Sequence, residues 1–361
     1  MKKNHKQAKH TLYAFSYASM LNDFSSDMLA SILPFIIKII GGNERDITII
    51  MGIRKGLSDL LAPLINYYTR SIRSTKMTIM AGYTISAFGR LLLLLSTIFF
   101  KSIFIVYISI IVDRMAKALR DPIRDSIIGA IAGKHKSLFF SIQRSFDTVG
   151  AFFGSLFAAI FSFLGGITLL FISALTGFLS VLPLINVNDY KKANHKNIKL
   201  TLNKAHIVSF IPFLQLNIGL PIAFFAKSFL ESIIFYVIFN LFFIFFSPFS
   251  GKFGDKNIKI ALFSSVFFSF LSFISFYFSQ PYIGFLFMGL SYAMFEGNAR
   301  AYITKNNKES FNLSLFYFFS GVFAILSSLI AAYVISIIGV INVFLLWALL
   351  HAFAIFIFKF I

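Results

Sequence analysis

The chain has 361 residues, of which 58% are hydrophobic and 13% charged, and its formal net charge is +19. A soluble domain has about a quarter of its residues charged and could not bury this much apolar surface in one core. The absence of cysteine excludes disulfides, thiol catalysis and cysteine-ligated metals. The basic residues form short clusters between apolar runs instead of one basic face, so the expected partner is a lipid bilayer and not nucleic acid.

Apolar stretches long enough to cross a bilayer recur along the whole chain. A transmembrane helix needs about 20 mostly apolar residues, and helices satisfy their own backbone hydrogen bonds in lipid. The sequence therefore predicts an all-α, polytopic membrane protein with twelve transmembrane helices. In chain order, the predicted spans are 12–39, 46–68, 77–100, 103–126, 138–163, 165–186, 206–227, 232–251, 258–279, 281–303, 310–335 and 337–359.

Lysine and arginine are distributed unevenly between alternate loops. Nineteen lie on the side that includes the N-terminus, and four lie on the other side, at Lys38, Arg45, Lys101 and Lys227. Cytoplasmic loops of membrane proteins carry the excess of basic residues. We therefore expect a multi-pass protein of the plasma (inner) membrane with its N- and C-termini in the cytoplasm.

The longest polar stretch lies in the middle of the chain, between Asn186 and Ala205, and it contains five lysines. It separates six predicted spans from the next six. We predict an N-terminal six-helix bundle over residues 1–186, a cytoplasmic linker over 187–205 and a pseudo-symmetric C-terminal six-helix bundle over 206–361. The other loops are too short to hold a separate catalytic domain.

Charged residues lie inside several predicted spans, most densely in the fourth, which carries seven between Asp113 and Asp125. Arg114 lies roughly 16 Å into this span, close to the midplane, at a rise of about 1.5 Å per residue. An ionisable group at that depth costs at least about 2.5–3.5 kcal/mol on insertion scales. Leaving aside Lys38 and Asp46, which flank the first loop, eight basic residues nearly balance seven acidic ones in the first five spans. This balance predicts ion pairs around a buried polar axis, which could be static or part of a transport pathway.

Prolines and glycines add a second signal. Prolines fall inside the first, second and seventh spans, at Pro34, Pro63, Pro212 and Pro221. We interpret these prolines as interruptions of the helices, and interrupted helices often line transport cavities. Taken alone, the signal is weak, because transmembrane helices tolerate proline generally. A second pattern, Gly150-x-x-x-Gly154, predicts close contact between two helices.

The helix plan and three motifs resemble the major facilitator superfamily (MFS). One motif is Gly251-Lys252-Phe253-Gly254-Asp255-Lys256, which is similar to the superfamily's Gly-x-Leu-Ala-Asp-Arg cytoplasmic loop. Its counterpart after the second span has lost the glycine and has Arg70 at the aspartate position. The second motif, residues 113–125, is similar to the Asp-Arg-x-Gly-Lys-Gly-x-Arg-x-x-Pro-Arg-Asp signature of a poorly characterised prokaryotic branch. Residues 22–28 resemble the Asn-Asp-x-x-Ser-Glu-Met motif of the same branch.

The resemblance implies the MFS fold and a role for Arg114 in handling substrate or protons. It also implies a conformational gate formed by Gly251, Asp255 and Lys256. Together with the charges inside the spans, it gives a predicted substrate and proton pathway. The pathway residues are Asn22, Asp23, Asp27, Asp59, Arg90, Asp113, Arg114, Lys117, Arg144, Asp147, Glu296 and Arg300.

These features predict a secondary active transporter that moves a small solute by alternating access. Proton coupling is expected, because a carboxylate such as Asp23 or Asp27 at membrane depth can exchange a proton with the side to which the cavity opens. Efflux or antiport is slightly favoured. The alternatives are an uncoupled or uptake facilitator and a non-transporting membrane sensor or scaffold on the same fold.

An enzyme is not expected from this sequence. It has no histidine and carboxylate cluster with metal-ligand spacing, no glycine-rich phosphate loop and no nucleophile–base pair. No cofactor or metal is therefore predicted. The expected partners are a small-molecule substrate, protons and the lipid bilayer, and the expected state is a monomer.

Overall fold

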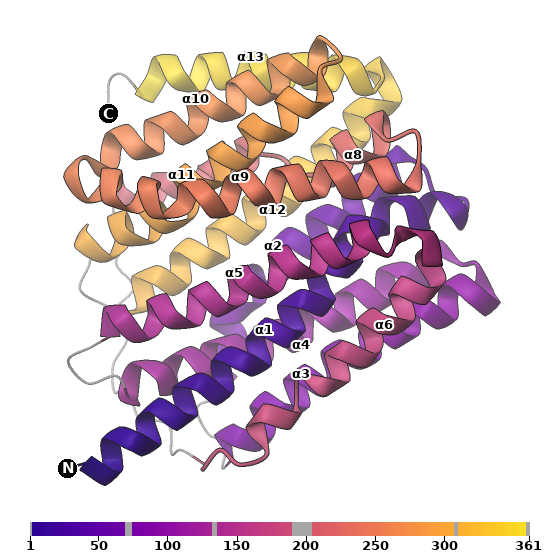
Figure 1. Cartoon of the computed structure of the whole chain (residues 1–361). Helices are drawn as coiled ribbons and strands as arrows, with labels where there is room; N and C mark the ends of the chain where they lie inside the picture. The colour runs from indigo at the N-terminus through magenta and orange to yellow at the C-terminus, as the bar shows by residue number, and fades with distance from the viewer. Residues whose placement is uncertain (1, 69–73, 132–135, 190–203, 307–309, 359–361) are drawn as a thin grey trace. The chain divides into compact units, whose positions relative to one another are not determined.

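The computed structural model describes residues 2–68, 74–131, 136–189, 204–306 and 310–358, and most of them are helical (Figure 1). The helices are α1 (Lys2–Ile39), α2 (Glu44–Tyr68), α3 (Thr75–Leu95), α4 (Ile103–Ile131), α5 (Lys136–Ile160), α6 (Gly166–Leu179), α7 (Ile211–Leu214), α8 (Gly219–Phe225), α9 (Phe229–Lys256), α10 (Ile258–Tyr277), α11 (Pro281–Asn306), α12 (Ser310–Ile338) and α13 (Val340–Phe358). A π-helical turn, η2 (Ser96–Phe100), extends α3, and the 3-10 turns η3 (Ser162–Leu164), η4 (Leu182–Leu184) and η5 (Lys204–Phe210) join other helices.

The helices of the described chain match the twelve predicted spans when α7 and α8 are counted as one interrupted segment. The largest difference at an end is in α1, which begins at Lys2 instead of residue 12. By length and composition, seven segments of the described residues could cross a membrane: Gln7–Ile39, Thr75–Phe100, Gly166–Leu184, Ile207–Phe225, Phe229–Lys256, Ile258–Tyr277 and Leu315–Ile338. Helix α4 is long enough but too charged to be among them, as its seven charged residues predict.

The contacts between residues divide the chain into two compact units. Unit 1 consists of Met1–Ile36 and Leu61–Asn197, and unit 2 consists of Ile37–Leu60 and Ile198–Ile361. The first part of α2 therefore belongs to unit 2. The predicted linker over 187–205 lies mostly outside the described residues, and the predicted division at that linker stays a prediction.

Unit 1 is a bundle of α1, α3, α4, α5 and α6. Its apolar core includes Phe15, Tyr83 and Ile128, each buried almost completely. The Gly150 and Gly154 pair brings α5 against α1: a Cβ on Gly150 would lie 2.2 Å from the carbonyl oxygen of Met20, and one on Gly154 would lie 2.1 Å from that of Phe24. The prediction of a close helix contact at this motif is confirmed.

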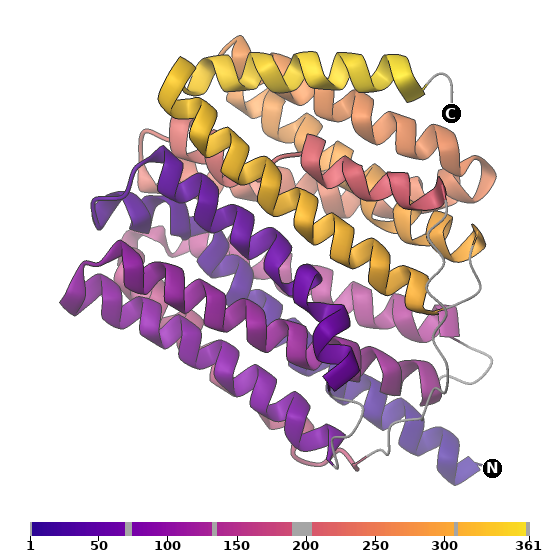
Figure 2. The same cartoon turned by 180° about the vertical axis from the view of Figure 1, so that it is seen from behind.

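Unit 2 contains the first part of α2 and helices α7 to α13. Its core includes Leu214, Val266 and Phe316. Helix α2 packs closely along α12. The approach is so close that a Cβ on Gly56 would lie 2.5 Å from the carbonyl oxygen of Gly321. Figure 2 shows the purple α2 beside the gold α12. Small residues on both helices allow this close approach.

The break between α7 and α8 confirms the predicted interruption of the seventh span. Leu216 adopts a left-handed backbone there, with φ of 42°. The side chain of Asn217 stabilises the break. Its Oδ1 accepts the backbone N–H groups of Gly219 (3.0 Å) and Leu220 (3.3 Å), which caps α8. Its Nδ2 donates to the carbonyl oxygen of Thr48 and to Ser328 Oγ, each at 2.9 Å.

Two other sequence-based interpretations are wrong. Pro34 and Pro63 do not interrupt their helices, since α1 and α2 run continuously through them. The motif Gly251–Lys256 is not a loop, because it forms the last turns of α9. The connection to α10 is Asn257 alone, whose side chain caps α10 by accepting the N–H of Ile260 at 3.3 Å. A one-residue link leaves no room for a loop at this motif.

Candidate functional site

Asp113 of α4 is the centre of a buried ionic cluster in unit 1 and is 1% exposed. Its carboxylate accepts hydrogen bonds from Ser86 Oγ, from Arg90 Nη2 at 3.5 Å and from Arg114 Nε at 2.8 Å. Ser86 and Arg90 lie one turn apart on α3, so both side chains face α4. Gly89 lies on the same side of α3, where an added Cβ would be 3.0 Å from the carbonyl oxygen of Ser109. The close helix contact brings Arg90 of α3 to the carboxylate that Arg114, the next residue on α4, already contacts.

Arg90 connects this cluster to α1 and is itself 1% exposed. Its Nη2 donates to Asn22 Oδ1 at 2.8 Å, and its Nη1 donates to Ser25 Oγ at 2.6 Å. Ser25 in turn bonds to Ser173 of α6. A Cβ on Gly177 would lie 2.7 Å from Arg90 Nη1, so this glycine provides room for the guanidinium group. We call Asn22, Ser25, Ser86, Arg90, Asp113 and Arg114 the Asp113 cluster.

A second group of charges lies further along α4. Arg120 pairs with Asp121 at 3.1 Å and stacks over the Tyr83 ring with its guanidinium carbon 4.4 Å from the ring centroid. Arg124 pairs with Asp125 at 2.9 Å and with Asp121 at 3.6 Å. Of these pairs, Arg124–Asp121 has the three-residue spacing that stabilises a helix. Arg124 also donates to Ser19 Oγ of α1 at 2.9 Å, so it ties α4 to α1.

A third group brings acidic residues of α1 and α5 together. Asp23 Oδ1 accepts a hydrogen bond from Asn22 Nδ2 at 3.2 Å, so it adjoins the Asp113 cluster. Asp27 lies one turn further along α1, and the Asp23 carboxylate interacts electrostatically with Asp147 of α5 and Lys117 of α4. We call Asp23, Asp27, Lys117 and Asp147 the Asp23 group. It differs from the Asp113 cluster in combining three carboxylates with one lysine.

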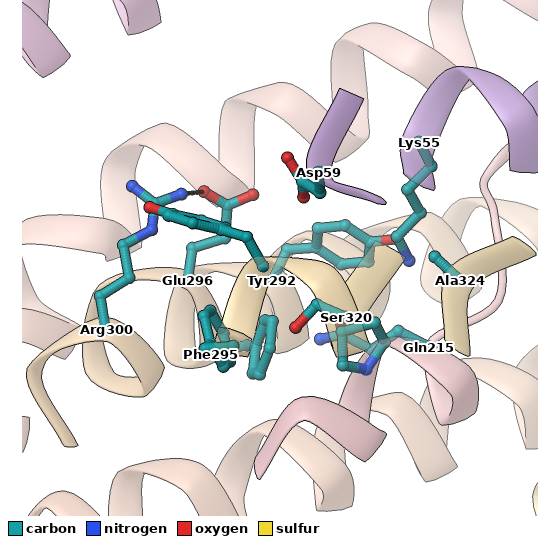
Figure 3. Close-up of a pocket in the computed structure, with 12 residues that line it drawn as sticks. Lys55, Asp59, Gln215, Tyr292, Phe295, Glu296, Arg300, Ser320 and Ala324 are labelled. Carbon is teal, nitrogen blue, oxygen red and sulfur yellow. Dashed lines mark hydrogen bonds and ion pairs between the residues drawn. The ribbon is translucent and has the colours of Figure 1, made fainter. Parts of the chain in front are cut away.

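A pocket of about 130 Å³ opens in unit 2 among α2, α7, α11 and α12 (Figure 3). It is lined by Lys55, Asp59, Pro212, Gln215, Tyr292, Phe295, Glu296, Arg300, Phe316, Tyr317, Ser320 and Ala324. Glu296 and Arg300, one turn apart on α11, form an ion pair of 3.2 Å. The pocket therefore combines charged groups with aromatic walls, which is typical of small-molecule sites.

The break between α7 and α8 lies at this pocket. The carbonyl oxygen of Leu216 accepts hydrogen bonds from Lys55 Nζ at 3.0 Å and from the Tyr292 hydroxyl at 3.1 Å. The Lys55 amino group also lies over the Tyr292 ring, 4.8 Å from its centroid. Lys55 of α2 and Tyr292 of α11 thus meet at the interrupted helix, where the left-handed residue leaves a carbonyl oxygen outside the helical hydrogen-bond pattern.

The predicted pathway residues fall into separate groups. Asn22, Arg90, Asp113 and Arg114 meet in the Asp113 cluster, and Asp23, Asp27, Lys117 and Asp147 meet beside it. Asp59, Glu296 and Arg300 line the unit 2 pocket instead. Arg144 lies on α5, and its side chain is outside the described residues. The predicted gate residues Gly251, Asp255 and Lys256 are exposed at the end of α9.

Sequence reasoning missed several polar residues of these sites. Ser25 and Ser86 complete the Asp113 cluster, and serines inside spans gave no signal of their partners. Gln215 is a polar residue between Pro212 and Pro221 of the seventh span. A polar side chain in an interrupted span is a signal from which this site residue could be predicted. Nothing in the sequence pointed to Tyr292 or Ser320. No group of three or more histidine, aspartate and glutamate side chains in the described residues is placed to hold a metal ion.

The fold is that of a multi-helix membrane protein, and comparison with known proteins identifies the family. The model of the Major Facilitator Superfamily matches residues 15–310. An uncharacterised MFS-type transporter of Methanocaldococcus jannaschii is 30% identical over 365 residues, which cover 91% of this chain and 89% of that protein. The chain belongs to the Major Facilitator Superfamily. It is a multi-pass membrane transporter with the MFS fold.

Solved structures agree with the fold. The nucleoside transporter NupG superposes with a TM-score of 0.76 at 16% identity, covering 97% of this chain and 98% of NupG. A POT family transporter in complex with 5-aminolevulinic acid superposes with a TM-score of 0.80 at 13% identity, covering 96% of this chain and 94% of that transporter. At such low identity these likenesses show the fold alone. The resemblance to one prokaryotic branch stays a prediction.

Proposed function

We propose that this protein is a secondary active transporter that moves a small solute by alternating access and couples it to protons, with efflux or antiport as the favoured direction. The observation that carries the proposal is the Asp23 group. A carboxylate grouped with two other carboxylates and one lysine is suited to bind and release a proton when helices α1, α4 and α5 shift. Asp113 is not suited to this role, because two arginines pair with it and the Ser86 hydroxyl donates to it.

The Asp113 cluster has the complementary role of a fixed framework. Its hydrogen bonds orient Asn22, which donates to Asp23 at 3.2 Å. If Arg90 or Arg114 moved, the hydrogen bonds through Asp113 and Asn22 would transmit that movement to the Asp23 carboxylate. Small solute, protons and lipid are the partners of this mechanism, and the protein acts as a monomer. An uncoupled facilitator is the competing function that the following experiment separates.

The test is Asp23→Asn in proteoliposomes that contain a pH-sensitive dye. Natural protein is expected to move protons when a transported solute from a metabolite and drug panel is added. Asp23→Asn should bring proton movement and gradient-driven solute flux to the level of protein-free liposomes, because the amide cannot exchange a proton. The matched control is Asp46→Asn at the first turn of α2, which should keep both signals. Gradient-driven flux that is unchanged in Asp23→Asn would contradict the proton role, and flux without proton movement in natural protein would establish a facilitator.

Orientation in the plasma membrane can be tested with introduced cysteines, because the natural chain has none. We propose that both termini are cytoplasmic. Lys252, on the last turns of α9, and Lys101, between η2 and α4, are both exposed. A membrane-impermeant maleimide should label Lys101→Cys in intact cells and Lys252→Cys only after permeabilisation. The reverse pattern would show that the chain is inserted the other way, and the cysteine-free chain gives the background.

A further inference from the structure

The unit 2 pocket contains a buried hydrogen-bond acceptor that the protein itself leaves unused. Gln215 is 1% exposed, and its Nε2 donates to Ser291 Oγ at 3.0 Å. The Ser291 hydroxyl donates its single hydrogen to the carbonyl oxygen of Ser265 at 2.8 Å. Because that carbonyl can only accept, Ser291 must receive a hydrogen from Gln215, which fixes the amide orientation. Oε1 of Gln215 is then left buried without a partner among the described protein atoms.

A second unpartnered polar group lines the same pocket. Ser320 of α12 is 6% exposed, and its Oγ has no hydrogen-bond partner among the described residues. Buried polar side chains are nearly always hydrogen-bonded, so two such groups in one cavity point to a ligand. Figure 3 shows both side chains on the side of the pocket below Tyr292.

The charges of the pocket favour an uncharged ligand. Two basic side chains, Lys55 and Arg300, and two acidic ones, Asp59 and Glu296, line the pocket, so their formal charges balance. Glu296 pairs with Arg300 at 3.2 Å. A net charge on the ligand would remain uncompensated in this partly buried site, which is costly.

The pocket also presents a donor next to its acceptor. The Lys55 amino group has three hydrogens and donates one to the carbonyl oxygen of Leu216. Gln215 is the residue before Leu216, so the Lys55 donor and the Gln215 acceptor lie at the same helix break. A ligand that satisfies both needs an N–H or O–H group next to a hydrogen-bond acceptor, as a cyclic amide has.

Size and walls restrict the class further. The volume of about 130 Å³ is close to that of the ~150 Å³ cavity known to accept benzene. Phe295, Phe316, Tyr292 and Tyr317 line it with aromatic surface, which packs well against a flat ring. A single six-membered ring satisfies both conditions.

We propose that this pocket binds a small, uncharged, planar cyclic amide whose N–H donates to Gln215 Oε1 and whose carbonyl oxygen accepts from Lys55. Ser320 Oγ bonds to a second polar edge of the same ring. The inference that this ligand is the transported solute rests on the proposed function. The binding site itself does not depend on it.

Uracil is the probe, and its binding to the purified protein in detergent is measured by calorimetry. We expect natural protein to bind uracil and not 1,3-dimethyluracil, which keeps the ring and carbonyls but has no N–H. Gln215→Met keeps the side-chain length and removes the acceptor, and it should weaken uracil binding by about 10- to 100-fold. Ser320→Ala should weaken it by a smaller factor. The matched control is Ser272→Ala, a buried serine that donates to the carbonyl oxygen of Gly284 at 2.9 Å and does not line the pocket.

Three results would overturn the proposal: no uracil binding by folded natural protein, equal binding of 1,3-dimethyluracil, or equal binding by Gln215→Met. The dimethyluracil comparison uses natural protein and so does not depend on the folding of a variant. Binding of glycerol or glycine in place of uracil would show that the ligand class is wrong. Uracil binding without uracil transport in proteoliposomes would preserve the site and count against its role in transport. Proton-coupled transport of another solute, unaffected by Gln215→Met, would preserve the transporter and count against the inference that the pocket holds the transported solute.

Discussion

Replacing Asp113 with leucine is expected to destabilise the protein by about 3–5 kcal/mol, because it leaves two buried arginines without their counter-charge. Arg90 is 1% exposed and Arg114 is 5% exposed, so neither can reach water without repacking. The Ser86 hydroxyl loses its acceptor at the same time. A large drop in the thermal unfolding temperature of purified protein in detergent is the expected measurement.

The matched control for this prediction is Asp125→Leu on the same helix. Asp125 pairs with Arg124 at 2.9 Å, but its side chain is 46% exposed. Arg124 is buried but keeps its second ion pair, with Asp121 at 3.6 Å. The Asp125→Leu variant should therefore be destabilised much less than Asp113→Leu, because no buried charge loses its last partner. The double variant Asp113→Leu with Arg114→Leu should be less destabilised than Asp113→Leu alone, because it removes one of the two unpaired charges. Equal effects of Asp113→Leu and Asp125→Leu would contradict the burial argument.

Gly154→Ala is expected to destabilise the protein by about 1–3 kcal/mol through overpacking, although alanine is the better helix former. The new Cβ would lie 2.1 Å from the carbonyl oxygen of Phe24. That atom belongs to the backbone of α1, so it cannot rotate away as a side chain could. Helices α1 and α5 would have to separate, and the Asp23 group, which they share, would be distorted with them.

Gly297→Ala on α11 is the control for the glycine prediction. No atom lies within 4 Å of a Cβ built at Gly297. Here the substitution should be neutral or stabilise the protein by up to about 0.5–1 kcal/mol, because glycine inside a helix is entropically unfavourable. Thermal unfolding of both variants in the same detergent measures the difference. The same sign of change at both positions would show that helix propensity, and not the contact with α1, controls stability at Gly154.

The sequence alone determined the number and position of the helices, because an apolar run of membrane length is a local property of the chain. It also determined the close contact at Gly150 and Gly154, since a glycine pair one turn apart marks a helix face that another helix can approach. The charges inside the fourth span indicated a buried polar site for the same local reason.

Only the tertiary structure decided which charges meet. The predicted pathway joins Asp59 to Asp23 and Asp113. In the structure, Asp59 instead lines a pocket with Glu296 and Arg300. The unused acceptor of Gln215 follows from a chain of hydrogen bonds through Ser291, which no sequence pattern contains. Which helices face one another depends on packing among all of them, and residues far apart in sequence carry no local mark of that contact.

The prolines illustrate the same limit. Pro34 lies inside a continuous helix, whereas the segment after Pro212 is broken, although the residue type is the same. A helix can open in a membrane only where other groups bond to the freed backbone. At the break, Lys55 and Tyr292 satisfy the carbonyl oxygen of Leu216, and Asn217 caps α8. Those partners come from α2, from α11 and from the break itself, so the fold and not the proline decided where the chain leaves the helix.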